Sequence, residues 1–197
     1  FSKIESGKLN LSEERVNIAD LCARSVEMIR HQAHQKNLEV LLNISTKIEE
    51  YILADGLRLR QILINLLSNA VKFTHKGEIE LKVQAQDIPD DPNTKRFTFS
   101  LRDTGIGIAP QNVKEIFDAF NQGDASTTRK YGGTGLGLTI SNRLLELMQS
   151  KLEVSSELGS GTTFSFSVDF AIEAKTERAA SYSQELKRVL VVDDNQN

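Results

Sequence analysis

Hydrophobic side chains recur with helical spacing in two long segments of this chain. The spacing predicts an amphipathic helix over residues 18–37, with apolar positions at Ile18, Leu21, Cys22, Val26 and Ile29. Residues 56–74 show the same period over a broader apolar side, made of Leu59, Ile62, Leu63, Leu66, Leu67, Ala70, Val71 and Phe73. We expect a long helix over each segment, buried along its apolar side.

Shorter apolar or alternating segments predict strands between and after these helices. The strands are expected over residues 38–45, 51–54, 78–86 and 96–103, and as a further pair within 151–170. A proline-containing turn is predicted at 87–95, a short helix at 111–117 and a longer helix at 134–149. Helices that alternate with hairpins indicate an α+β fold, a two-layer α/β sandwich on a mostly antiparallel sheet.

Composition excludes several classes of protein. The 197 residues are 39% hydrophobic and 26% charged, which is typical of a globular domain, and the net charge of −3 gives no excess of positive charge for nucleic acid. No apolar run approaches the roughly 20 residues of a membrane span. The single cysteine, Cys22, cannot form an internal disulfide, which favours a reducing, cytoplasmic location. Because the chain lacks an initiating Met, we expect a fragment of a longer protein, monomeric by itself.

Polar side chains form a narrow stripe on the predicted helix 56–74, opposite its apolar side. The stripe consists of Arg58, Gln61, Asn65, Asn69 and Lys72. Simple exposure to solvent would explain a polar stripe, but Glu or Lys is less costly than Asn in an exposed helix interior. Amide oxygens suit Mg²⁺, which takes one or two protein ligands and completes its shell with water and phosphate oxygens. The stripe therefore suits a site for a nucleotide with Mg²⁺.

A glycine-containing turn, Asp-Thr-Gly-Ile-Gly-Ile, follows the strand predicted at 96–103. A turn that merely ends a strand would use Asp and Gly in the same way. Alternatively, the Asp103 carboxylate accepts a hydrogen bond from an exocyclic amine such as that of adenine. Gly105 and Gly107 would then allow the backbone to approach a flat ring closely.

Four glycines, at 132, 133, 135 and 137, precede or open the helix predicted at 134–149. A helix N-terminus offers free N–H groups and a partial positive charge to an anion. The polar segment 120–130 before the glycines is expected to be a mobile lid over a phosphate chain. Arg129 and Lys130 lie near the phosphates in this reading, or else form a solvated pair of charges.

Three motifs now stand in order: NLLSNAVKFT at 65–74, DTGIGI at 103–108 and GGTGLGL at 132–138. EIFDAFNQGD lies between the last two, and GSGTTF follows at 159–164. Together they resemble the catalytic ATP-binding domain of sensor histidine kinases, in the gyrase/Hsp90/MutL-type ATPase superfamily, over about residues 16–170. The resemblance implies a Bergerat-type fold, a mixed, mostly antiparallel sheet with its helices on one face.

The resemblance also implies roles for individual residues. Asn65, Asn69 and Lys72 would be catalytic, with Asn69 as the Mg²⁺ ligand and Lys72 on phosphate. Phe73 would line the pocket, Thr162 would support the adenine site, and Phe117 and Phe120 would anchor the lid. The full set of predicted nucleotide contacts is Asn69, Lys72, Phe73, Asp103, Gly105, Gly107, Ile108, Phe120, Arg129, Lys130, Gly133, Thr134, Gly135, Leu136, Gly137, Leu138 and Thr162.

Asn65 distinguishes between the reactions of this superfamily. Hydrolytic relatives carry a Glu at the corresponding position, as the general base for water, and an amide cannot accept a proton at neutral pH. Asn65 therefore favours transfer of the γ-phosphoryl group to another nucleophile. Two alternatives remain open at this stage, a degenerate nucleotide-binding module that only docks partners and a hydrolytic ATPase.

The flanking segments indicate a longer, hybrid histidine kinase. Residues 1–15 resemble the end of a dimerisation and phosphoacceptor hairpin, and 171–187 look like a linker. Residues 188–197 resemble the start of a receiver domain, with Asp193 and Asp194 near a Mg²⁺ site, or carry a chance pair of acids. None of the histidines, at 31, 34 and 75, has the context of an acceptor. The expected partners are the protein's own hairpin, in a homodimeric parent that could be membrane-anchored, and its receiver domain, with no nucleic acid.

Overall fold

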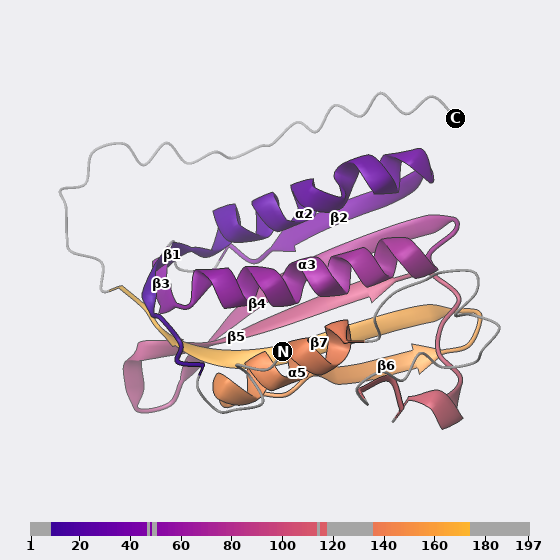
Figure 1. Cartoon of the computed structure of the whole chain (residues 1–197). Helices are drawn as coiled ribbons and strands as arrows, with labels where there is room; N and C mark the ends of the chain where they lie inside the picture. The colour runs from indigo at the N-terminus through magenta and orange to yellow at the C-terminus, as the bar shows by residue number, and fades with distance from the viewer. Residues whose placement is uncertain (1–8, 47, 49–50, 114, 118–135, 174–197) are drawn as a thin grey trace.

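The computed structural model describes residues 9–46, 48, 51–113, 115–117 and 136–173 (Figure 1). The helices are α2 (Ile18–Gln35), α3 (Gly56–Phe73) and α5 (Gly137–Leu147), with 3₁₀ turns at Pro110–Asn112 and Glu115–Phe117. The strands are β1 (Glu14–Asn17), β2 (Leu38–Ile44), β3 (Tyr51–Ala54), β4 (Gly77–Ile88), β5 (Asp91–Asp103), β6 (Glu153–Glu157) and β7 (Gly161–Ala171).

Five strands form one mixed sheet in the order β2-β4-β5-β7-β6. β2 runs parallel to β4, and the other neighbouring pairs are antiparallel. The helices cover one face of this sheet (Figure 1). The predicted two-layer α+β sandwich is therefore confirmed, as are both long helices and the hairpin of β4 with β5.

The core lies between the helices and the covered face of the sheet. The predicted apolar side of α3 is buried except at Phe73, which is half-buried, and Phe99 of β5 stacks on Phe166 of β7 with ring centroids 4.8 Å apart. Side-chain caps fix where the helices begin: Asn17 Oδ1 accepts from the Asp20 N–H at 2.9 Å, and Asp55 Oδ1 accepts from the Arg58 N–H at 3.0 Å.

Three local predictions need correction, and one strand was not predicted. The turn predicted at 87–95 is shorter, since β4 continues to Ile88 and β5 resumes at Asp91 around a left-handed Asp90. The helix predicted at 111–117 is replaced by the two 3₁₀ turns, and α5 begins at Gly137 rather than at 134. β1 was missed: it pairs antiparallel with β3, but four residues with one buried side chain are too short to show a period.

Candidate nucleotide site

The C-terminal half of α3 carries the predicted amide and ammonium groups. Arg58 and Gln61 at the other end of the stripe bond to each other at 3.0 Å, on the surface. Asn65, Asn69 and Lys72 are half-buried although they lie opposite the core side of the helix. Gln61 is exposed, so solvation explains its polarity, whereas Asn65, Asn69 and Lys72 line a partly enclosed region.

Asn65 is held by the first turns of α5. Its Nδ2 donates to the Ser141 hydroxyl at 2.9 Å, and Ser141 is only 1% exposed. The Cα of Gly137 lies so close that an added Cβ would overlap Asn65 Oδ1. The glycine therefore lets the beginning of α5 approach α3. Ser141 was missed by sequence reasoning, although a serine one turn after Gly137 could have indicated a polar contact there.

Lys72 and Phe73 end the helix with an ammonium group beside an aromatic ring. Lys72 Nζ lies 4.8 Å from the centroid of the Phe73 ring. Partial burial lowers the pKa of the Lys72 ammonium below its ordinary value. A cation that has already lost part of its water interacts more strongly with an incoming anion.

Asp103 ends β5 as a buried carboxylate. Burial raises the pKa of Asp103 above its ordinary value, and hydrogen bonds from the backbone of Gly105 and Thr162 and the charge of Arg102 oppose that shift. The Gly105 N–H donates to Oδ1 at 2.8 Å. The second carboxylate oxygen can accept a hydrogen bond from a ligand amine.

The turn after β5 is bonded directly to the end of α3. The Ile106 N–H donates to the Phe73 carbonyl at 3.2 Å. A Cβ on Gly105 would lie 2.5 Å from that carbonyl oxygen and 2.8 Å from Asp103 Oδ1, so glycine permits this close approach. The predicted adenine-reading carboxylate and the predicted phosphate-binding end of α3 are thus brought together across a single turn.

The same turn is also joined to the β6–β7 hairpin. Gly107 has φ +68°, and a Cβ there would overlap the Glu157 carbonyl. The Ile108 N–H donates to the Ser156 hydroxyl at 2.8 Å, which in turn lies 2.9 Å from the Thr162 hydroxyl. Thr162 therefore supports the turn through Ser156, a residue that sequence reasoning missed.

Several predicted contacts lie outside the described residues: Phe120, Arg129, Lys130, Gly133, Thr134 and Gly135. Phe117 is half-buried in the second 3₁₀ turn, and its carbonyl accepts from the Thr139 hydroxyl at 3.0 Å. Leu136, Gly137 and Leu138 are half-buried at the start of α5.

Two of the hollows on the described part of the chain bear on the site. One of about 220 Å³ includes Asp103 and Thr162. The larger, of about 810 Å³, contains none of the predicted site residues and lies along Phe166–Ala171 of β7, toward the other end of the strands. Size alone would therefore select a different end of the sheet from the predicted site.

The described residues contain no group of three or more His, Cys, Asp or Glu placed to hold a metal ion. The half-buried amides of Asn65 and Asn69 offer one or two oxygens, which fits Mg²⁺ whose other ligands are water and phosphate. In the same part of the chain, no helix is both long and apolar enough to cross a membrane.

Comparison with known proteins bears on this geometry. The family model described as histidine kinase-, DNA gyrase B- and HSP90-like ATPase matches residues 54–172. Hybrid signal transduction histidine kinase B of Dictyostelium discoideum is 36% identical over 178 residues, covering 90% of this chain and 9% of that protein. Signal transduction histidine-protein kinase BarA of Escherichia coli is 39% identical over 170 residues, covering 86% of this chain and 18% of BarA.

A solved structure agrees in fold. Full-length ShkA, crystallised in complex with AMPPNP, superposes with a TM-score of 0.72 at 38% identity, covering 87% of this chain and 34% of that one. The chain thus spans less than a fifth of the length of the two curated relatives above and about a third of ShkA.

Proposed function

This chain belongs to the family of histidine kinase-, DNA gyrase B- and HSP90-like ATPases, and we propose that it binds Mg-ATP and donates the γ-phosphoryl group to a histidine. That histidine would lie on a dimerisation and phosphoacceptor hairpin of the same longer protein. The relatives are signal transduction histidine kinases, one of them a hybrid kinase by name. The proposal extends their activity to a chain that covers only a part of each.

One observation carries the proposal: the contact between the turn after β5 and the end of α3. Ile106 donates to the Phe73 carbonyl, and Gly105 lies against both that carbonyl and Asp103. A purine held by the Asp103 carboxylate would have its phosphates directed toward Asn69 and Lys72. Because one junction would then contact both ends of the nucleotide, the arrangement suits a nucleotide better than a lone anion.

The residues on α3 suit phosphoryl transfer in which geometry and charge do most of the work. Lys72 would neutralise charge on the phosphates, and Asn69 would contribute one oxygen to Mg²⁺. The bound Mg²⁺ would supply charge neutralisation on the phosphate oxygens. Asn65, with its amide oriented by Ser141, provides no base for activating water.

The proposed partners are the protein's own acceptor hairpin and a receiver domain downstream. His31 and His34 lie on the exposed side of α2, and His75 follows α3 on the surface. None of the three lies in the predicted acceptor sequence context, so the acceptor would be elsewhere in the longer protein.

The proposal is tested by mixing this chain with a separately produced acceptor hairpin and γ-labelled Mg-ATP. Acid-labile, base-stable label on the hairpin is the expected result. Nucleotide binding without transfer would instead support a docking module, and free phosphate released without the hairpin would support a hydrolytic ATPase. Asn69→Ala serves as the matched inactive control, because it removes the proposed Mg²⁺ ligand without changing charge.

A further inference from the structure

Lys36 occupies an unexpected place at the end of α3. It follows α2, in the two-residue turn that leads into β2, and Asn37 beside it is left-handed with φ 54°. Its Nζ donates to the carbonyl oxygens of Val71 at 2.6 Å, Lys72 at 3.1 Å and Thr74 at 3.3 Å. All three ammonium protons are thus used on one stretch of backbone.

These contacts complete the carbonyl end of the helix. The last four carbonyls of an α-helix have no partner within the helix. In α3 the Ala70 carbonyl accepts from the Thr74 N–H and the Phe73 carbonyl accepts from the Ile106 N–H. Lys36 supplies the partner for the two carbonyls between them.

The carbonyl end is also the wrong end of a helix for a polyphosphate. Aligned peptide dipoles leave roughly half a negative charge at a helix C-terminus. The proposed phosphate-binding groups of Asn69 and Lys72 lie within the last turn and a half of α3, where this charge would repel an anion. An ammonium group placed on the carbonyls themselves cancels it locally.

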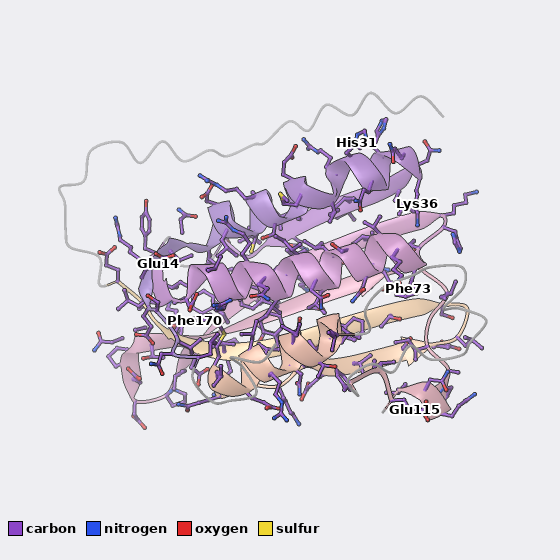
Figure 2. The ribbon with its side chains drawn as sticks, viewed as in Figure 1. Glu14, His31, Lys36, Phe73, Glu115 and Phe170 are labelled. Carbon is purple, nitrogen blue, oxygen red and sulfur yellow. The ribbon has the colours of Figure 1, made fainter. Side chains whose placement is uncertain are left out.

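We propose that Lys36 is a positioning residue for the phosphates of ATP, acting through the end of α3 rather than by touching the nucleotide. It holds the last turn in shape and offsets the negative helix end, so that Lys72 can act on the phosphates with its full charge. The inference rests on the proposed function. Figure 2 shows Lys36 and Phe73 at the same end of the helical layer.

Displacement of a fluorescent ATP analogue from the whole 197-residue chain tests the proposal, with Mg-ATP and adenosine as competitors. Lys36→Met is expected to weaken Mg-ATP binding roughly tenfold, the scale of a well-placed charge at a helix terminus. Adenosine, which has no phosphates, should bind within about twofold of wild type. Lys36→Arg should recover part of the loss, since it restores the charge. Lys151→Met, which removes a charge paired with Glu153 on an exposed side chain, is the matched control.

Two results with Lys36→Met would overturn the inference. One is unchanged Mg-ATP affinity in Lys36→Met. The other is an equal loss for Mg-ATP and adenosine, which would make Lys36 a structural support only. If Lys36→Met does not fold, Lys36→Gln replaces it, because its uncharged amide can still donate to the carbonyls, and the same selective loss is expected. If the wild-type chain binds adenosine but not Mg-ATP, both the inference and the proposed function are overturned. If the wild-type chain binds Mg-ATP and Lys36→Met binds it with the same affinity, only the inference is rejected.

Discussion

Replacing Asp103 by Asn tests the proposed hydrogen bond from the adenine amine to the Asp103 carboxylate, because the two side chains differ in their hydrogen-bond donors and acceptors. In the structure the carboxylate accepts from the Gly105 N–H at 2.8 Å and from the backbone of Thr162, and its two oxygens still have acceptor capacity for a ligand amine. Asn has only one acceptor oxygen. If that oxygen keeps the bond to Gly105, the amide NH₂ faces the amine of adenine, donor against donor.

The expected loss follows from this mismatch. A hydrogen bond to a charged group contributes about 1.5–3 kcal/mol, so Asp103→Asn should weaken Mg-ATP binding roughly 10- to 150-fold. A guanine ring presents a carbonyl acceptor at the same position, so the preference for ATP over GTP should narrow or reverse. Isothermal titration calorimetry with both nucleotides measures the two effects together.

Stability should change in the opposite direction to affinity. Burial raises the pKa of Asp103 in the folded chain, so the group favours folding below its ordinary pKa of about 3.9 and loses that contribution as pH rises through the raised value. Asp103→Asn should therefore gain thermal stability relative to wild type as pH is raised across this window. Unchanged ATP affinity, or a variant that loses stability relative to wild type as pH rises over the same range, would refute the reasoning.

Three other outcomes are expected. Asn69→Ala should abolish the dependence of nucleotide binding on Mg²⁺, measured by titration with and without a chelator; Mg²⁺ dependence that survives would remove Asn69 from the site. Gly105→Ala should lower both ATP affinity and the melting temperature, because its Cβ would lie 2.5 Å from the last carbonyl oxygen of α3. Gly159→Ala is the control, since nothing lies within 4 Å of its added Cβ. It should lose only the stability that the strain of its positive φ costs, and its ATP affinity should be unchanged. Cys22 is buried and its pKa is raised to about 12 by that burial, so it should resist a thiol reagent at pH 8 until the chain unfolds; rapid labelling of the native chain would contradict the buried core of α2.

Local patterns were enough to predict the layers of this protein. The 3.6-residue period of α3 and the alternation along β4 are visible in neighbouring residues, and the motifs at 65–74 and 103–108 predicted two segments that the structure places in contact. α3 and the hairpin of β4 with β5 formed where these patterns indicated. The ends of elements were less predictable, as at Gly137 and in the 87–95 turn, because pairing and packing decide where a helix begins and where two strands part.

The polar contacts that hold the site together were decided only by the tertiary structure. Lys36 reaches the end of α3 across 35 residues, Ser141 reaches Asn65 across 76, and Ser156 reaches Ile108 across 48. A lysine, two serines and a short strand such as β1 have no period of their own to reveal a partner. Their roles arise because burial of the apolar faces brings distant backbone and side-chain groups into a region with little water, where each polar atom must find a partner within the protein.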